Sequence, residues 1–304
     1  MLYDITASIV LYRNDVNDVR TVMQSFLSVH KKTKLFLIDN SPTNTLKALL
    51  DDLIAKHDVV YMHSTKNIGF GAAHNIAMRS AVKLAPYHIV LNPDIEFKSD
   101  AVDNMFGFME ANEDVGQLLP NVYYRNGDVQ KHCKLLPGPL HLIGRRFLHK
   151  LKWAEKKNKE YELEGFKYDR CLDTPNLCGC FMFLRTDCLK TIGFFDTRFF
   201  MYLEDVDLTR RIHKISKTLF YPFVSVVHNY QRGSYKDVKL LFYHMQSAVN
   251  YFTKWGWLVD REKDKFNNDV LNSIKNGSLQ RLHPIQPNNV KSINLFKEQP
   301  KKIG

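Results

Sequence analysis

Apolar residues follow two different spacings along the first part of the chain. Short runs rich in aliphatic and β-branched residues predict buried strands at 5–12, 35–38, 59–62, 88–91 and 116–119. Between these runs, apolar residues recur every three or four positions, which predicts amphipathic helices at 16–27, 46–54, 73–84 and 100–112. Strands that alternate with helices favour an α/β fold with a mostly parallel, Rossmann-like central sheet and helices on both faces.

The second part of the chain is less regular. The pair Asn126-Gly127 predicts a hairpin turn within 121–130. Apolar spacing predicts further strands at 178–184, 219–221 and 224–228 and helices at 187–191 and 238–252. The last part is polar, basic and interrupted by prolines, as is typical of a loosely held end. We expect a main domain over 1–230, with halves 1–120 and 121–230, and a C-terminal helical extension and basic tail over 231–304.

Polar residues gather where three predicted strands end. Asp39 follows the second strand, a glycine-bearing loop at 67–75 follows the third, and 92–96 follows the fourth. Because parallel sheets bind ligands beyond the carboxyl ends of their strands, we expect these loops to line one site. The loop 67–75 precedes a helix and suits a phosphate group. It lacks the third glycine of the dinucleotide fingerprint and the ending of a Walker loop, so a simple tight turn stays open.

Two acids follow the fourth strand. Asp94 and Glu96 carry the oxygen ligands that hard divalent cations prefer. Such cations take few carboxylates from the protein and complete their shell with substrate phosphates and water. The alternative is a Pro93-Asp94 turn that only closes the strand.

The segment 199–211 holds a dense group of charges. Glu204, Asp205 and Asp207 fall within four positions, and two arginines follow them. One interpretation is a surface helix whose acidic first turn suits the helix dipole and pairs with arginines one turn later. The other is that one carboxylate is a general base that deprotonates an acceptor hydroxyl. Both interpretations remain open on this pattern alone.

Composition narrows the class of protein. The chain has 304 residues, of which 44% are hydrophobic and 12% aromatic, so it can bury a substantial core. No apolar run reaches about 18 residues, the length that predicts a membrane-spanning helix. The N-terminal strand contains Asp4 and lacks the basic start and apolar core of a secretion signal. We therefore expect a cytoplasmic protein.

The five cysteines do not form a recognisable framework. Their number is odd, and no Cys-x-x-Cys pair is present. Cys178 and Cys180 would point to one face of a strand, but no second ligand pair has zinc-finger spacing. We expect reduced thiols with packing roles rather than a zinc site.

The formal charge of +11 indicates an affinity for polyanions. Residues 141–159 contain seven Lys or Arg and a single Glu, and apolar residues recur through 140–151 at helical spacing. This pattern is typical of a helix that lies on an anionic membrane surface, although a solvated helix packed on the domain remains an alternative. A nucleic-acid partner is not expected, because basic residues interleaved with exposed aromatics in a known module are missing.

Several segments together resemble the inverting glycosyltransferases of family 2. The matching segments occur in the same order and spacing over roughly residues 4–230. They are Ser-Ile-Val-Leu-Tyr at 8–12, Leu-Ile-Asp-Asn-Ser at 37–41, Asn-Ile-Gly-Phe-Gly-Ala-Ala-His-Asn at 67–75, Leu-Asn-Pro-Asp at 91–94, Gly-Cys-Phe-Met-Phe-Leu-Arg at 179–185, and Gly-Phe-Phe-Asp at 193–196 leading to Glu-Asp-Val-Asp-Leu at 204–208. Within the family, the chain is most similar to bacterial rhamnosyltransferases. The resemblance implies a GT-A nucleotide-diphospho-sugar transferase fold, with a donor-binding half over 1–120 and an acceptor half over 121–230.

The resemblance also implies roles for individual residues. Asp205 matches the catalytic base, and Glu204 and Asp207 would support it by contacting the acceptor or pairing with an arginine. Asp94 and His228 would hold Mg²⁺ or Mn²⁺, although His228 fits a solvated strand-end histidine equally well. Asn92 replaces the first acid of the family's Asp-x-Asp motif, which leaves the metal with fewer charged ligands. The nucleotide-sugar contacts implied are Tyr12, Asp39, Asn67, Gly69, Asn75, Asn92 and Asp94, and those to acceptor or diphosphate are Cys178, Gly179, Arg210 and Arg211.

The expected reaction is transfer of a sugar from a nucleotide-diphospho-sugar, with dTDP-rhamnose as the first choice. The implied acceptor is a polyprenyl-diphosphate-linked saccharide used to build O-antigen or another cell-surface polysaccharide. The enzyme would then act peripherally on the inner face of the cell membrane. Alternatives are a UDP-sugar donor, a non-catalytic sugar-binding homologue, or a nucleotidyltransferase. The last would usually carry a glycine-rich basic signature near the first strand, which 11–14 does not resemble.

Overall fold

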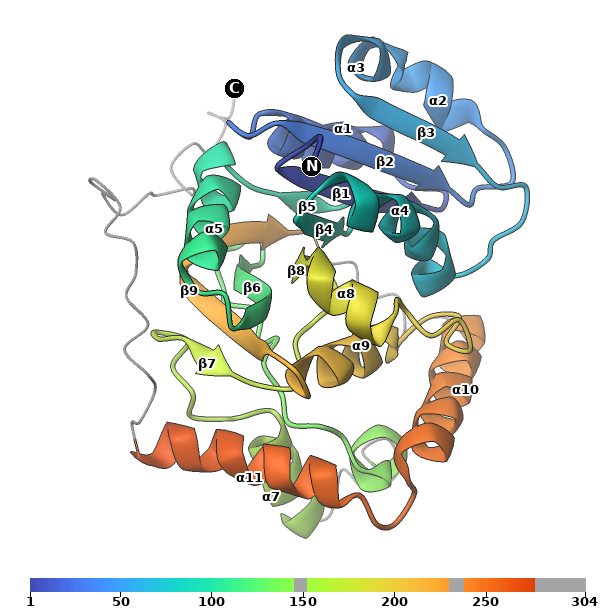
Figure 1. The fold of residues 1–304 in the computed structure, drawn as a ribbon. Helices are drawn as coiled ribbons and strands as arrows, with labels where there is room; N and C mark the ends of the chain where they lie inside the picture. Colours follow the sequence, from blue (N-terminus) through green and yellow to red (C-terminus); the bar gives the residue numbers. More distant parts are fainter. Residues whose placement is uncertain (145–151, 230–237, 277–304) are drawn as a thin grey trace, which may run out of the picture.

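The structure, a computed structural model, describes residues 1–144, 152–229 and 238–276. These residues form one nine-stranded sheet with the order β3-β2-β1-β4-β8-β6-β9-β5, and β7 pairs with β9 (Figure 1). Helices lie around the sheet, and the strand order places segments from both parts of the sequence side by side. The α/β fold class expected from the sequence is confirmed.

The first half contributes four neighbouring parallel strands to the sheet. Strands β1 (Ile5–Leu11), β2 (Thr33–Asp39), β3 (Val59–His63) and β4 (Tyr87–Leu91) run in one direction. All of β4 and nearly all of β1 is buried, as expected for strands covered on both faces. The connecting helices are α1 (Val16–Leu27), α2 (Thr45–Leu49), α3 (Asp51–Lys56) and α4 (Phe70–Leu84). The single helix predicted at 46–54 is thus divided into two short ones.

The second half makes the sheet mixed. Strand β8 (Phe181–Arg185) runs antiparallel to β4 and to β6 (Val115–Tyr123). Because β8 is antiparallel to both β4 and β6, and β9 pairs with β6 in parallel, the strands β1, β2, β3, β4, β6 and β9 run in one direction. The expectation of a mostly parallel sheet is therefore confirmed, with β5, β7 and β8 as the antiparallel members. The chain reaches β8 through a long excursion, not through a single crossover helix that would keep the strands parallel. The remaining elements here are β5 (Ile95–Glu96), α5 (Ser99–Ala111), β7 (Leu172–Asp173), α8 (Thr186–Ile192) and α9 (Glu204–His213).

The two short strands predicted at 219–221 and 224–228 form one strand, β9 (Lys217–His228). Its pairing with β6 shifts in the middle, because Pro120 faces Tyr221 while the next residue, Asn121, faces Ser225. Pro222 lies in this irregular part and has no amide hydrogen for the ladder, which explains the interruption in the pattern. The strand ends at His228, next to β5.

The C-terminal helices pack on the acidic segment. Helix α10 (Val238–Trp255) and helix α11 (Arg261–Asn276) follow β9 and lie on the side of the molecule opposite β3 (Figure 1). Apolar residues of α10 share a buried cluster with residues just before and within α9: Leu136, Phe199, Leu203, Val206, Ala248, Tyr251 and Phe252. None of the helices in the described ranges combines the length and apolar character needed to cross a membrane.

The basic segment predicted at 140–159 is only partly described. A π-helical turn covers Leu140–Gly144, and helix α7 covers Lys152–Tyr161. The ring of His141 stacks on that of Tyr161, with centroids 4.8 Å apart, so the two described ends of the segment are in contact. Residues 145–151, which include Arg145, Arg146 and Lys150, lie outside the described residues. The predicted membrane helix is therefore still a prediction.

Candidate active site

Asp39, the last residue of β2, lies fully buried at the carboxyl edge of the sheet. Its carboxylate accepts hydrogen bonds from the Ser41 amide, at 2.8 Å, and from the Tyr61 hydroxyl. The Ser41 hydroxyl accepts in turn from the amide of Arg13 at 2.9 Å, which joins the loops after β1 and β2. Tyr12, in the loop after β1, is 43% exposed and so is open to a ligand. The edge expected to bind the nucleotide is thus ordered by its own polar contacts.

The turn before α4 is shaped by a glycine. Gly69 has a φ of +87°, and its amide donates to Oδ1 of Asn67 at 3.0 Å. The next amide, of Phe70, donates to the carbonyl of Phe200 at 2.9 Å. A Cβ on Gly69 would lie 2.4 Å from that carbonyl oxygen, so only glycine fits. This turn therefore packs directly against the segment that leads into α9.

Asn75 has a positioning role that differs from the expected one. Its Nδ2 donates to the carbonyl of Phe195 at 2.8 Å, and its Oδ1 accepts from the amide of Phe195 at 3.0 Å. The residue is 2% exposed. Because both polar groups of the side chain hold the backbone at Phe195, Asn75 does not present its amide to a nucleotide. It attaches the segment 193–196 to α4.

The predicted metal position is assembled from β4 and β9. His228 Nε2 lies 3.3 Å from Oδ1 of Asp94 and 3.3 Å from Nδ2 of Asn92. His228 is 3% exposed, whereas Asp94 is partly exposed. Glu96, the other acid considered for a cation, is exposed on β5. The sequence-predicted pair Asp94 and His228 is thus brought together from positions far apart in the chain.

Gln130 orients this histidine and was missed by sequence reasoning. Its Oε1 accepts from Nδ1 of His228 at 3.0 Å and from Nε2 of His132 at 2.8 Å. Its Nε2 donates to the His228 carbonyl at 3.0 Å, which fixes which end of the amide faces the two rings. A proton on Nδ1 leaves Nε2 of His228 as the acceptor that faces Asp94. An oxygen and a nitrogen acceptor at this separation fit a shared divalent cation, held by Asp94 and His228.

The acidic helix α9 begins after an unusual backbone pair. Tyr202 and Leu203 have φ values of +71° and +66°, a left-handed conformation that costs about 1–3 kcal/mol for each residue. Helix α10 supports this segment. The Ser247 hydroxyl donates to the carbonyl of Met201 at 2.8 Å, and the rings of Tyr202 and His244 meet with centroids 5.5 Å apart. The start of α9 is therefore held in place by the C-terminal part of the chain.

Glu204 and Asp205 are adjacent but differ in their environments. Asp205 Oδ2 accepts from the amide of Gly179 at 2.8 Å, and Oδ1 accepts from the amide of Val206 at 2.9 Å. Burial, with a smaller effect from nearby Cys178, raises the pKa of Asp205 to about 6. Burial and the neighbouring Asp205 raise the pKa of Glu204 well above its usual range. Because the pKa of Asp205 lies below neutral pH, its carboxylate is mostly ionised there and can accept a proton.

The third acid, Asp207, is structural. Its side chain is fully buried and accepts from Nε of Arg211 at 2.9 Å and from Nε1 of Trp255 at 2.9 Å. Nζ of Lys254 lies 2.7 Å from its Oδ1. The predicted pairing of an acid with Arg211 is present. Of the two supporting roles expected for Asp207, pairing with an arginine is the one that the structure shows, and the three donors around the carboxylate leave it no contact with an acceptor.

The two arginines also have roles other than those expected. Arg210 is 1% exposed and forms a bidentate ion pair with Asp260, with two contacts of 2.7 Å, above the ring of Trp255. Arg211 donates to the carbonyls of Ile192 and Phe194 at 2.9 and 2.7 Å. The guanidinium group of Arg210 ties helix α9 to Asp260, and that of Arg211 ties the same helix to the backbone carbonyls of Ile192 and Phe194. Their predicted contacts to an acceptor or a diphosphate are replaced by structural ones.

A short turn links the two sides of the site. Gly179 binds Asp205 through its amide, and the next carbonyl, of Cys180, accepts from the amide of Asn92 at 2.9 Å. A Cβ on Gly179 would lie 2.8 Å from the Cβ of Asp205, so this close approach requires glycine. The turn 178–180 therefore connects the candidate base to the loop that carries Asp94.

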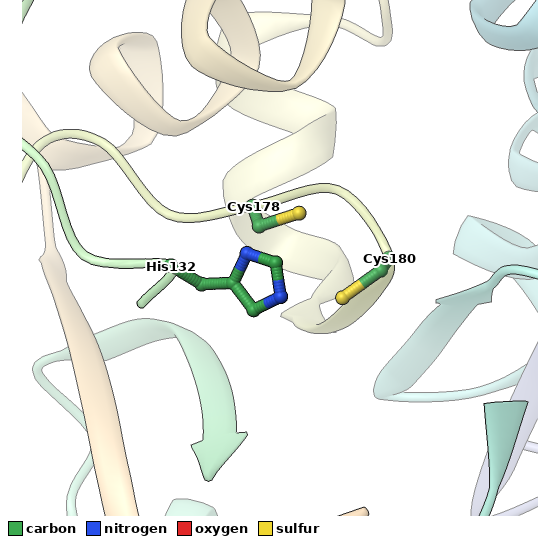
Figure 2. Close-up of side chains that lie close together, drawn as sticks. All are labelled: His132, Cys178 and Cys180. Carbon is green, nitrogen blue, oxygen red and sulfur yellow. The ribbon is translucent and has the colours of Figure 1, made fainter. Parts of the chain in front are cut away.

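The same turn carries two thiols next to a histidine. Figure 2 shows His132, Cys178 and Cys180 with their side chains gathered in one place. Interactions with the Cys180 thiol and with His132 lower the pKa of Cys178. Sequence spacing gave no signal for this group, because the histidine comes from a distant segment.

The sequence matches Glycosyl transferase family 2 over residues 8–193. This span is more than half of the chain and reaches from β1 to the end of α8, but it stops before α9. A relative in Mycobacterium tuberculosis, N-acetylglucosaminyl-diphospho-decaprenol L-rhamnosyltransferase, is 24% identical over 226 residues. The alignment covers 69% of this chain and 71% of the relative.

Similar solved structures share the fold. GalNAc-T7 with UDP, GalNAc and Mn²⁺ has a TM-score of 0.57 at 16% identity, and the match covers 91% of this chain and 58% of that one. The mannosyltransferase PcManGT from Pyrobaculum calidifontis, in complex with GDP-Man and Mn²⁺, has a TM-score of 0.53 at 14% identity, covering 92% and 77%. TarS from S. aureus in complex with UDP-GlcNAc has a TM-score of 0.53 at 13% identity, covering 88% and 72%. With the family match, these structures identify the chain as a glycosyltransferase of family 2 with the GT-A fold.

Proposed function

We propose that this glycosyltransferase moves a sugar from a nucleotide-diphospho-sugar to a hydroxyl of a polyprenyl-diphosphate-linked saccharide, with inversion at the anomeric carbon. The observation that carries the proposal is the turn 178–180, which joins Asp205 to the loop of Asp94. A base on one side and a leaving-group position on the other are what direct displacement requires.

In the proposed reaction, the Asp205 carboxylate takes the proton from the acceptor hydroxyl. The hydroxyl oxygen forms its bond to the anomeric carbon while the bond to the diphosphate breaks, so the nucleotide diphosphate leaves. The Gly179 amide holds the accepting carboxylate at the edge of the site. Glu204 lies beside Gly71 at the start of α4, and its raised pKa favours the neutral carboxyl, which adds no repulsion toward a diphosphate.

Asp94 and His228 are the residues that would hold Mg²⁺ or Mn²⁺ in this reaction. Such an ion, when bound, neutralises the charge that develops on the departing diphosphate. Gln130 keeps His228 in the tautomer that a metal ligand needs. Two of the similar structures contain Mn²⁺, which supports a divalent ion here.

We propose dTDP-rhamnose as the donor and an N-acetylglucosaminyl-diphospho-polyprenol as the acceptor, on the strength of the name of the mycobacterial relative. The test is a hydrolysis and thermal-shift screen of dTDP-rhamnose, UDP-GlcNAc, UDP-galactose and GDP-mannose, each with and without Mn²⁺. We expect selective stabilisation and slow hydrolysis of dTDP-rhamnose. Selective turnover of a UDP-sugar would show that the donor proposed is wrong. Incubation of the selected donor with N-acetylglucosaminyl-diphospho-polyprenol then tests the acceptor, and absence of sugar transfer to it would contradict the acceptor proposed.

We also propose that the basic segment 140–159 brings the enzyme to an anionic membrane, where lipid-linked acceptors lie. Its charges support this, because each Lys or Arg near an anionic leaflet contributes about 1 kcal/mol. In liposome flotation, reversing the charge of Arg145, Arg146, Lys150 and Lys152 is expected to abolish binding. The matched control reverses four exposed lysines elsewhere, namely Lys32, Lys56, Lys66 and Lys83. Equal flotation of both variants would refute the membrane role of this segment.

A further inference from the structure

Two distant segments of the chain meet beside the candidate base. Cys133 and Leu177 form an antiparallel bridge, so the preceding residue on one strand faces the following residue on the other. This register places His132 next to Cys178. Cys180 follows two positions later, just before β8, and Figure 2 shows its thiol turned toward the same histidine ring.

The three side chains have the geometry of a ligand set. One nitrogen of His132 and the two sulfurs all lie within 4.8 Å of one another. With zinc–sulfur bonds of about 2.3 Å and zinc–nitrogen bonds of about 2.0 Å, a tetrahedral ion requires its ligand atoms to lie about 3.5–3.8 Å apart. Small side-chain adjustments therefore bring the three atoms onto one ion and leave its fourth position open.

The histidine is already oriented for this role. His132 Nε2 is 2.8 Å from Oε1 of Gln130, an acceptor, so the proton lies on Nε2 and Nδ1 is left as the ligand nitrogen. Metal-binding histidines typically donate their other ring N–H to such an oxygen. The amide of Gln130 is fixed by its bond to the His228 carbonyl. One glutamine thus orients both His132 and His228.

The surrounding charge favours a cation. The carboxylates of Asp94 and Asp205 are both close enough to Cys180 to act on its thiol. Two thiolates and a neutral imidazole form a soft ligand set that prefers zinc-like ions, whereas Asp94 and His228 offer the oxygen and nitrogen ligands that suit Mn²⁺. The two positions therefore differ in chemistry although they share Gln130.

We propose that His132, Cys178 and Cys180 bind a thiophilic divalent ion, Zn²⁺ or its equivalent, at a site separate from the proposed catalytic metal. Binding replaces the two thiol protons by bonds from the sulfurs to the ion. Because Gly179 lies between the two cysteines, the ion also fixes the turn whose amide holds Asp205. The inference does not depend on the identity of the donor or acceptor.

The test is a Co²⁺ titration of the reduced, metal-stripped full-length protein. We expect one equivalent to give the thiolate-to-cobalt charge-transfer band and Zn²⁺ to displace it, while excess Mn²⁺ does not. Cys178→Ser and Cys180→Ser should abolish the band, and Gln130→Ala should weaken binding about 10–100-fold. Cys171→Ser and Cys188→Ser are matched controls at buried thiols outside the cluster and should keep the band.

A second measurement uses the wild-type protein, so it does not depend on whether the serine variants fold. Mass spectrometry after alkylation under partly denaturing conditions should show that Zn²⁺ protects Cys178 and Cys180 of the wild-type protein and no other cysteine. The proposal is overturned if the band is absent, if it survives both serine variants, or if Zn²⁺ protects a different pair of thiols. None of these readouts uses transferase activity, so a wrong donor leaves the test intact.

Discussion

The amide of Gly179 donates a 2.8 Å hydrogen bond to Oδ2 of Asp205, from a position at which a side chain would collide with Asp205. The two residues come from different elements, so the position of the carboxylate depends on both. A buried acid with a pKa of about 6 is suited to accept a proton near neutral pH. Burial and the nearby Asp205 carboxylate raise the pKa of the neighbouring Glu204 well above its usual range, which disfavours its ionised form beside the base.

Asp205→Asn is expected to lower kcat by about 100- to 10,000-fold, the usual contribution of a general base. The rate of the wild-type enzyme should fall about tenfold per pH unit below about 6, because the base is then protonated. Glu204→Gln is the matched control, since amide and protonated carboxyl are both neutral, and it should retain most of the rate. A larger loss in Glu204→Gln than in Asp205→Asn would move the base to Glu204.

Gln130→Ala is expected to weaken Mn²⁺ binding about 10–100-fold, because His228 loses the acceptor that fixes its tautomer. Asp94→Ala and His228→Ala, which remove ligands, should weaken it further. The measurement is the Mn²⁺-dependent rise in Tm in the presence of UDP or dTDP. Gln24→Ala, at an exposed position of α1, is the control and should behave as wild type. The assignment fails if Gln130→Ala and Gln24→Ala give the same Mn²⁺ dependence.

Gly69→Ala and Gly193→Ala separate steric contact from backbone strain. Both glycines have nearly the same conformation, with φ of +87° and +80° and ψ of 170° and −173°. A Cβ on Gly69 meets the Phe200 carbonyl, whereas a Cβ on Gly193 meets nothing within 4 Å. We expect Gly193→Ala to cost about 1–3 kcal/mol in the free energy of unfolding. Gly69→Ala should cost clearly more and also weaken nucleotide binding, and equal losses in urea unfolding would show that the contact with Phe200 is unimportant.

Arg210→Ala is expected to destabilise the protein by about 3–5 kcal/mol, because it leaves Asp260 buried without its partner. The matched control is Arg20→Ala, which removes a similar bidentate pair with Asp52 at the surface. That loss should be about 0–1 kcal/mol. Both values come from denaturant unfolding. If Arg210→Ala cost no more than Arg20→Ala, α9 would not depend on this ion pair.

Stability should fall in mild acid because of buried histidines behind the site. His88 is fully buried between the hydroxyls of Thr6 and Ser8, and burial lowers its pKa to about 3. The unfolded chain binds a proton near pH 6.5 and the folded one does not, so stability is lost as pH falls from about 6.5 toward about 3. This amounts to about 2 kcal/mol between pH 6.5 and pH 5.

His88→Gln should therefore be less stable than wild type at pH 7 but lose less stability between pH 7 and pH 5. Unfolding free energies at the two pH values give the comparison. His57→Gln, at an exposed histidine after α3, should keep the wild-type slope. An unchanged slope in His88→Gln would contradict the assignment of the acid loss to His88.

Local patterns predicted the first half of the fold well. The strands β1, β2 and β4 and helix α4 were expected near their observed bounds. A strand that is buried on both faces appears in the sequence as an apolar run, and an amphipathic helix appears as apolar residues that recur every three or four positions. The antiparallel entry of β8 was not predictable in this way, since the choice of strand partner depends on contacts between distant residues. The same reason accounts for the interrupted pairing of β9 with β6.

The candidate site, like the fold, was predicted only in part. The resemblance to family 2 pointed to Asp94 and His228, which the structure brings together. It did not point to Gln130, whose role depends on two histidines from different segments. The role of Arg210 was predicted wrongly, because the acids that pair with it lie beyond α10. Helical spacing within α9 could not point to them.

The contacts between α9 and the C-terminal part of the chain have a consequence for the order in which parts of the fold can form during synthesis. Strands β1 to β4 pair with one another, so the first part of the chain has most of its sheet partners early in translation. Asp207 pairs with Arg211 inside α9, but its other two donors are Lys254 and Trp255, and the carboxylates that pair with Arg210 are Asp260 and Glu262. A chain still attached to the ribosome before this point holds the family-matched segment but not an anchored acidic helix. Anchoring of the acidic helix α9 is therefore tied to the arrival of residues that the family match does not include.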